Sequence, residues 1–268
     1  MKIITWNING YRSIVGQNPS KKYDVITKDN RFFSYVEKEK PDIICVQEIK
    51  AEPGQIDNDL LCPSGYQYFY YPCQTKKGYS GVATFSRLPA LSYSSGFGNK
   101  IFDDEGRIII AEFKNFIHLN IYFPKGYADN ERLGYKLSFY DYLFANISKL
   151  KKKNPNIIIS GDYNTAHKEL DLARPKENIG TSGFMPQERL KLDELVNLGF
   201  VDVFRLFEQK GGYYSWWSQR GRAKENNIGW RIDYHFATQN MKNMFKSCFY
   251  QPDIDGSDHC PLVTEFVI

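Results

Sequence analysis

The sequence predicts an α/β fold with mixed β-sheets. Short runs rich in β-branched and aromatic residues recur from one end of the chain to the other, and their length is typical of strands. Fewer stretches have the three- and four-residue apolar spacing of a helix. Some neighbouring runs are close enough in sequence to form hairpins, which favours mixed sheets over a purely parallel sheet.

The predicted strands consist mainly of Ile, Val, Phe, Tyr and Thr, which suit a pleated and half-buried surface. In chain order they are residues 2–6, 42–47, 66–71, 81–86, 107–113, 116–122, 156–160, 213–217, 231–237 and 261–267. They are spread over the whole chain, so the sheets must combine segments that are far apart in sequence.

Three helices are predicted between these strands. The clearest covers residues 130–152 and carries an apolar stripe of Leu133, Leu137, Tyr140, Phe144 and Ile147. Residues 186–198 predict a second helix, because Pro186 suits its first turn and Gly199 follows its end. Residues 29–42 predict a third, which Pro41 stops.

The 268 residues, 42% of them hydrophobic, are enough to bury a sizeable core. We find no internal repeat, low-complexity linker or break in composition, so the sequence predicts a single domain over residues 1–268. The formal net charge of +4 permits a polyanionic partner without demanding one.

Five scattered cysteines without a Cys-x-x-Cys pair indicate reduced thiols rather than a metal cluster. There is no charged and apolar leader, and no apolar run approaches the roughly 18–20 residues needed to cross a bilayer. We therefore expect a monomer without membrane contact, in the cytoplasm or elsewhere inside the cell, nucleoid-associated or nuclear according to the host.

Polar side chains stand repeatedly at the ends of the predicted strands. These are Asn7 after the first strand, Glu48 after the second, Asp162 and Asn164 after 156–160, Asp233 within "RIDY", and Asp258-His259 before the last strand. A single Asp or Asn in such a place is usually a turn residue. Their joint occurrence favours a site, because one rim of a sheet can gather groups that are distant in sequence.

The chemistry of these side chains favours a hard cation. Oxygen-bearing groups, namely Asn7, Glu48 and Asp258 with Asn9 and Asp162 as further candidates, suit Mg²⁺. Zinc is less favoured because no set of His and Cys has ligand spacing. His259 has a different use, since a partner carboxylate such as Asp233 would fix its tautomer and free its other nitrogen for substrate or water.

With these residues in view, the chain resembles the exonuclease III family of apurinic/apyrimidinic (AP) endonucleases, within the endonuclease/exonuclease/phosphatase superfamily. The motifs run nearly end to end in the family's order: "WNINGYR", "VQEIKA", "GYSGVATFSR", "IYFPKG", "GDYNTAH", "GFMPQER", "GWRIDY" and "GSDHCP". The resemblance implies a four-layer α/β sandwich, in which two mixed β-sheets pack face to face with helices outside.

The resemblance also implies roles for the strand-end residues. Glu48 would be the principal metal ligand, completed or supported by Asn7, Asn9 and Asp258. Asp162 would position or activate the attacking water, and Asn164 would orient it or contact the scissile phosphate. Tyr122 would place its phenol against phosphate oxygens, and His259, held by Asp233, would bind the phosphate and steady its developing charge.

Further residues resemble the family's DNA-binding surface. Trp216 and Trp230 stand where the family has the aromatic walls of a damage pocket, although tryptophan is also a common core residue. Lys125 departs from the family, which has Asn or Gln there. Arg220 and Tyr127 occupy loops that insert into DNA, and backbone contacts are expected from Arg174, Asn178, Lys76 and Arg222.

The implied function is Mg²⁺-dependent incision of duplex DNA 5′ to abasic sites, with 3′→5′ exonuclease or 3′-phosphatase activity on 3′-end lesions. One or two ions, Mn²⁺ as a substitute, the choice of Asp162 or His259 as base (we favour Asp162), and action on uracil or damaged bases stay open. Two alternatives are a phosphatase or phosphodiesterase acting on a non-DNA substrate and a non-catalytic DNA-binding relative.

Overall fold

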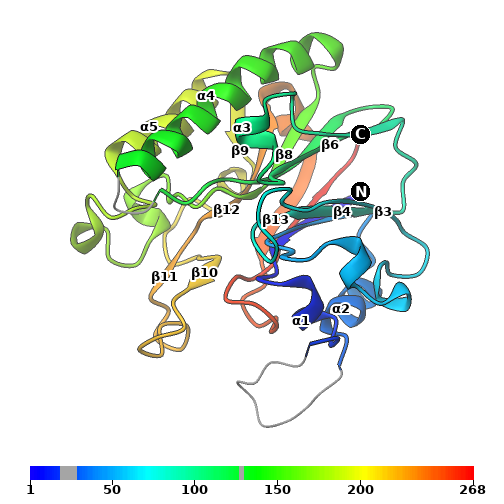
Figure 1. The fold of residues 1–268 in the computed structure, drawn as a ribbon. Coiled ribbons are helices and arrows are strands. Elements are labelled where there is room, and N and C mark those ends of the chain that lie inside the picture. Colours follow the sequence, from blue (N-terminus) through cyan, green and yellow to red (C-terminus); the bar gives the residue numbers. More distant parts are fainter. Residues whose placement is uncertain (19–28, 127–129) are drawn as a thin grey trace.

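The computed structural model describes residues 1–18, 29–126 and 130–268. In this part of the chain, two six-stranded mixed sheets face each other and helices cover their outer sides (Figure 1). In that view α4 and α5 lie at the top, α1 and α2 lie at the bottom, and the sheets lie between them. The predicted four-layer α/β sandwich is confirmed.

The first sheet joins the N-terminal strands to the C-terminal ones. Its order is β13 (Phe245–Tyr250), β14 (Leu262–Phe266), β1 (Lys2–Asn7), β2 (Ile43–Gln47), β4 (Val82–Ser86) and β3 (Gln67–Tyr71). β1 and β2 are parallel, whereas the other pairs are antiparallel. The carboxyl ends of β1 and β2 therefore lie at the same edge as the start of β14.

The second sheet is built from the middle of the chain. Its order is β5 (Ser92–Ser95), β6 (Ile108–Glu112), β7 (Ile117–Tyr122), β8 (Ile157–Asp162), β12 (Asp233–Thr238) and β9 (Phe200–Asp202). β7 and β8 are parallel, and β12 is antiparallel to β8. The ends of β7 and β8 and the start of β12 consequently share one edge.

The three longer helices cover the outer faces of the sheets, as amphipathic helices do. α4 (Asn130–Lys153) and α5 (Pro186–Asn197) bury Phe139, Leu143 and Leu192 against the second sheet. α2 (Arg31–Glu39) packs Phe32 and Val36 on the first sheet. Asn30 accepts a hydrogen bond from Phe33 N–H and begins α2.

The buried stripe of α4 differs from the predicted one. Leu133, Leu137 and Phe144 are only half-buried, whereas Phe139, Tyr140, Leu143 and Ile147 face the sheet. The helix carries apolar residues around much of its circumference, so spacing alone did not select the buried side. The predicted bounds of the helix were correct to within a residue.

Shorter elements connect these layers. They are α1 (Tyr11–Ile14), α3 (Lys100–Asp103), the 3₁₀ turns Pro53–Gln55, Asn58–Leu60, Glu169–Asp171, Lys176–Asn178, Phe204–Leu206 and Gln239–Met244, and the hairpin of β10 (Trp216–Trp217) with β11 (Gly229–Trp230). The hairpin projects from the edge of the sandwich, at the lower left of Figure 1. The sequence predicted a longer strand over 213–217 and did not predict β5, β9, β11 or β13.

Candidate active site

Polar residues of the second sheet lie side by side on three neighbouring strands. Tyr122 at the end of β7 pairs in register with Asp162 at the end of β8, and Asp162 pairs with Asp233 at the start of β12. Asp162 and Asp233 are almost fully buried. The strand pairing therefore delivers a phenol and two carboxylates to one edge of this sheet.

The first sheet brings its own polar residues to the same place. The Asn7 amide nitrogen donates to Glu48 Oε1 at 2.9 Å and to Asp162 Oδ2 at 2.8 Å. Asn7 ends β1, Glu48 follows β2, and Asp162 ends β8. The fully buried Asn7 side chain thus joins the two sheets and holds two carboxylates at a fixed separation.

Glu48, Asp162 and His259 form an inner group of side chains that could hold a metal ion. One ligand atom from each lies within 4.8 Å of the others. The two carboxylates suit a hard divalent ion, which takes oxygen ligands and keeps several waters. Of the four predicted ligands, Glu48 belongs to this group, Asn7 donates to two of its carboxylates, and Asn9 donates to Asp258 Oδ1 at 2.9 Å.

His259 is held between two acids. Its Nδ1 lies 2.8 Å from Asp233 Oδ2, and its Nε2 lies 3.9 Å from Asp162 Oδ2. Burial alone would lower the pKa of His259, but Asp233 and Asp162 outweigh it and raise this pKa above its ordinary range. Burial and the neighbouring Asp233 raise the pKa of Asp162. In the metal-free protein the two acids therefore favour the cationic imidazole, so Glu48 and Asp162, and not His259, are the ligands that this group offers to a metal ion.

The backbone around these residues is unusual. Asn9, Glu48, Lys50 and Asn164 all have φ between 48° and 55°, a left-handed conformation that costs energy outside glycine. Gly161 has φ 149°, and a Cβ there would lie 1.8 Å from the Ile121 carbonyl oxygen. Such positions cluster at functional sites, and here they aim the side chains that follow the strand ends.

Two cations that the sequence analysis missed contact the site. Lys50 Nζ lies 2.6 Å from Glu48 Oε2. Arg107, which is 1% exposed, places its guanidinium 4.8 Å from the Tyr122 ring centre and donates to the Tyr122 carbonyl at 2.9 Å. Two features of the sequence could have identified these cations. Lys50 follows Glu48 by two residues in "VQEIK", and Arg107 begins the predicted strand 107–113, which pairs with the strand of Tyr122.

Tyr122 and Asn164 hydrogen-bond to the two carboxylates of this inner group. The Tyr122 hydroxyl donates to Glu48 Oε1 at 3.0 Å. Asn164 N–H donates to Asp162 Oδ1 at 2.8 Å, and the Asn164 side chain donates to Asp162 Oδ2 at 3.4 Å and to the Phe123 carbonyl at 3.0 Å. The carboxylates of Glu48 and Asp162 thus each accept several hydrogen bonds that fix their directions.

The two tryptophans of the predicted pocket lie beside the site. Trp216 pairs with Trp230 across the β10–β11 hairpin, and Trp216 also bridges to His259. Both rings are half-buried and pack on an apolar cluster that includes Leu172 and Phe184. Trp217, the neighbour of Trp216 on β10, is 4% exposed and points inward.

The remaining predicted DNA contacts lie further out on the surface. Lys125, Arg174, Arg220, Arg222 and Lys76 are exposed, and Asn178 is half-exposed. The Asn178 side chain donates to the Arg174 carbonyl at 2.8 Å, and Arg174 forms an exposed ion pair with Glu177. Tyr127 lies outside the described residues.

Asp171 supports the site through buried ion pairs. With Glu169 it bounds a 3₁₀ turn. Asp171 is nevertheless fully buried, accepts from Arg231 Nε at 2.8 Å and also contacts Arg205. This ion cluster fixes the chain just before Asp233.

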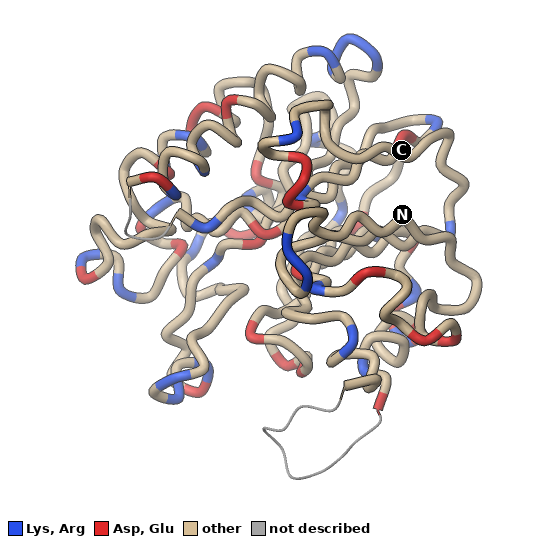
Figure 2. Tube along the Cα trace, viewed as in Figure 1, with Lys and Arg blue, Asp and Glu red and all other residues tan. Residues whose placement is uncertain are grey.

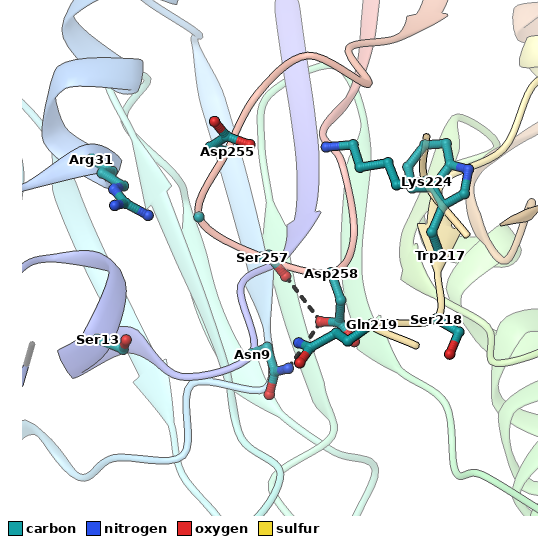
Figure 3. Close-up of a pocket in the computed structure, with 11 residues that line it drawn as sticks. Asn9, Ser13, Arg31, Trp217, Ser218, Gln219, Lys224, Asp255, Ser257 and Asp258 are labelled. Carbon is teal, nitrogen blue, oxygen red and sulfur yellow. Dashed lines mark hydrogen bonds between the residues drawn. The ribbon is translucent and has the colours of Figure 1, made fainter. Parts of the chain in front are cut away.

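An open polar cavity of about 520 Å³ adjoins the site on the side of Asn9 and Asp258 (Figure 3). Arg31 and Lys224 contribute cations to its lining, and Asp255 contributes an acid. Its wall on one side consists of Trp217 of β10 and the residues Ser218 and Gln219 that follow it. Solvent thus reaches the outer oxygens of the site through this cavity.

Residues 4–259 match the endonuclease/exonuclease/phosphatase family. The chain belongs to this family. An exodeoxyribonuclease from Bacillus subtilis (strain 168) is 40% identical over 98% of both chains. A DNA-(apurinic or apyrimidinic site) endonuclease from Dictyostelium discoideum is 36% identical over 98% of this chain and 69% of that protein.

A solved structure of an AP endonuclease from Archaeoglobus fulgidus has the same fold. It superposes with a TM-score of 0.86 at 27% identity, covering 100% of both chains. The chain is thus a hydrolase of the exodeoxyribonuclease and AP endonuclease type. Among the described residues, no helix is both long enough and apolar enough to cross a membrane.

Proposed function

We propose that this chain is a Mg²⁺-dependent DNA repair phosphodiesterase that incises duplex DNA 5′ to abasic sites. The observation that carries the proposal is the convergence of Glu48, Asp162 and His259 within 4.8 Å. Its relatives named as AP endonuclease and exodeoxyribonuclease support the choice of substrate. We also propose that it acts as a monomer and a single domain inside the cell.

The divalent ion would be held by Glu48, with Asp162 nearby and Asn9 and Asp258 outside. When bound, such an ion neutralises charge on the phosphate oxygens and on the leaving oxygen. Carboxylate and carboxamide oxygens fit Mg²⁺ and also Mn²⁺. The Asn9–Asp258 pair supplies further oxygens beside Glu48, so the site has groups for one ion or for two.

Asp162 would accept the proton of the attacking water. Its raised pKa makes it a stronger base than an ordinary aspartate, and hydrogen bonds from Asn7 and Asn164 direct its oxygens. His259 is a poor candidate for this step because its two acidic neighbours keep it protonated at neutral pH. The geometry and charges therefore favour Asp162 as the base.

His259 would instead donate a charged hydrogen bond to the phosphate. Asp233 accepts from Nδ1, which leaves Nε2 facing the inner group. The Tyr122 phenol and the Asn164 amide would bind further phosphate oxygens as negative charge develops there. These donors are fixed before substrate arrives, so they need little reorganisation in the transition state.

Selection of an abasic site requires a pocket that admits a sugar without a base. Trp216 and Trp230 are half-buried beside His259 and would form its apolar walls. The loop between β10 and β11 carries Arg220, Arg222 and Lys224. This loop lies at the lower left of Figure 2, and its basic side chains would contact the DNA backbone. The exposed Lys125 would add a cation at the pocket mouth.

The decisive experiment compares nicking of an abasic duplex with Mg²⁺ and with EDTA. We expect cleavage only with the metal ion. Glu48→Ala and His259→Ala should each lower kcat/KM by roughly 10²–10⁴-fold, because one removes the principal ligand and the other the charged donor. Glu37→Ala, on the exposed side of α2, is the matched control and should retain full activity.

The same experiment separates the alternatives. A duplex with a recessed 3′ end tests exonuclease activity, a 3′-phosphate tests phosphatase activity, and a uracil duplex tests incision at base lesions. The exodeoxyribonuclease from B. subtilis favours exonuclease activity among these. Turnover of inositol phosphates but not abasic DNA would replace the proposal with a non-DNA phosphatase. Tight DNA binding without metal-dependent cleavage would indicate a non-catalytic relative.

A further inference from the structure

Lys50 places its ammonium directly among the oxygens expected to bind the divalent ion. Its Nζ lies 2.6 Å from Glu48 Oε2 and donates to Asn9 Oδ1 at 2.5 Å. Both oxygens belong to residues predicted to hold or support the metal. An ammonium and a divalent ion cannot both occupy the inner contact distance of the same oxygens, because they repel each other.

The backbone holds Lys50 in this place. Its φ is 50° and that of Glu48 is 55°, so the non-glycine residues on both sides of Ile49 adopt a left-handed conformation. Lys50 N–H donates to the Ser80 carbonyl at 3.0 Å, and Ile49 N–H donates to the Gly81 carbonyl at 3.1 Å. Only the Lys50 side chain, and not its backbone, is free to move when an ion binds.

The charge around the site explains why a cation is needed there. Glu48, Asp162, Asp233 and Asp258 bring four carboxylates to one edge of the sandwich, and His259 supplies one positive charge among them. The ammonium of Lys50, 2.6 Å from Glu48 Oε2, compensates part of this negative charge. The Lys50 side chain is 32% exposed and that of Glu48 is 18% exposed. Partial exposure also allows the ammonium to leave into solvent.

We propose that Lys50 is a resident counter-cation that competes with the divalent ion for Glu48 and Asn9. It stabilises the metal-free protein and weakens metal binding, so the ion enters only as the ammonium moves aside. Lys50 is a positioning residue in this sense, and its role rests on the function proposed above. It sets the metal concentration at which the enzyme becomes active.

Removal of the charge should tighten metal binding. We expect Lys50→Met and Lys50→Gln to bind Mg²⁺ roughly tenfold more tightly than the wild type in calorimetric titrations at about 0.1 M salt. Their melting temperatures in EDTA should fall, and the rise in melting temperature on adding Mg²⁺ should grow. Lys50→Arg keeps the charge and should stay near the wild-type affinity.

Two controls make the result specific. Lys152→Met removes the same charge from the exposed end of α4 and should leave Mg²⁺ affinity unchanged. In the wild type, ¹³C-methylation of lysines should give a Lys50 resonance, identified by its loss in Lys50→Arg, that shifts on Mg²⁺ addition with the calorimetric Kd. This second measurement is made on the wild type and needs only the charge-conserving Lys50→Arg variant to assign the resonance.

Two outcomes would overturn the inference. One is equal or weaker Mg²⁺ binding by both neutral variants, and the other is a Lys50 resonance that ignores Mg²⁺. Neither touches the proposed function as long as the wild type binds Mg²⁺ and nicks abasic DNA. If the wild type fails to bind Mg²⁺ at all, the proposed function fails as well, and the two failures are therefore distinguishable.

Discussion

Among the residues around His259, Asp233 raises the pKa of its imidazole most. Burial disfavours the imidazolium, and Asp233, at 2.8 Å from Nδ1, is the strongest influence that opposes it. Asp162 adds to this effect from 3.9 Å. The raised pKa of His259 therefore depends on the contact between Asp233, which begins β12, and His259, which lies in the loop before β14.

Asp233→Asn should therefore shift the pH dependence of catalysis. Loss of the carboxylate lowers the pKa of His259, so the imidazolium is lost at a lower pH. We expect the alkaline limb of the kcat/KM profile on abasic DNA to move to lower pH by about one unit or more, together with a lower maximum. An unchanged alkaline limb would mean that His259 does not act as a cation.

A matched variant separates charge from general disturbance. Asp202→Asn changes a carboxylate on β9 that contacts Arg231 Nη2 at 2.6 Å, away from the inner group. It should alter stability without moving the alkaline limb.

At the scale of elements, one buried ion pair ties two helices to the active-site loops. Lys136 of α4 and Glu188 of α5 are both fully buried, with Nζ and Oε1 2.8 Å apart. Lys136 also donates to the Asn164 carbonyl at 2.7 Å, and Glu188 accepts from Gly183 N–H at 2.6 Å. The pair links Asn164 to the loop that packs under Trp230.

Breaking this pair from one side should be costly. Lys136→Met leaves the Glu188 charge buried without its partner, and the free energy of unfolding in urea should fall by about 3–5 kcal/mol. The double variant Lys136→Met/Glu188→Gln should recover a large part, because a neutral amide needs no counter-ion and still accepts from Gly183. A double variant as unstable as the sum of the single ones would contradict this account.

The elements themselves were largely predictable from the sequence. Apolar runs such as 42–47 and 156–160 became buried strands, and the Pro and Gly signals bounded α5 correctly. Short pairings such as β10 with β11 could not be predicted, since two residues carry no periodicity. The four-layer arrangement itself came from the family resemblance, because it depends on contacts between distant segments.

The site was predictable in its residue types but not in its connections. The polar residues at strand ends were visible, and the structure brings Glu48, Asp162 and His259 together. The contact of Lys50 with Glu48 depends on two left-handed residues, and that of Arg107 with Tyr122 depends on pairing between β6 and β7. Such geometry follows from the tertiary structure and leaves only a weak mark on the sequence.

At the scale of the whole molecule, the two sheets meet through a polar layer as well as an apolar one. Gln47 of the first sheet donates to Asn120 Oδ1 of the second at 2.8 Å, and Asn120 donates back to the Ala83 carbonyl at 2.8 Å. All of these side chains are fully buried. The layer fixes how the sheets align, because buried polar groups lose their partners if the sheets slide.

Two histidines in this layer should make the sandwich sensitive to acid. His235 Nε2 donates to the Leu262 carbonyl, so its Nδ1 accepts from Ser160 Oγ, which in turn accepts from His118 Nε2 at 2.8 Å. Both imidazoles are therefore neutral, and burial lowers the pKa of His118 to about 3 and that of His235 to about 4.

In the unfolded chain these histidines titrate near pH 6.5, so the stability that they contribute is complete above that pH and is lost progressively below it. Between pH 6.5 and 5, the free energy of unfolding of the wild type should fall by about 1.5 kcal/mol more than that of His118→Gln, which removes one of the two groups. Urea titrations at the two pH values measure this difference, and the comparison cancels groups common to both proteins. Parallel pH dependence would mean that His118 gains its proton in the folded protein, and the two sheets would then tolerate a charge between them.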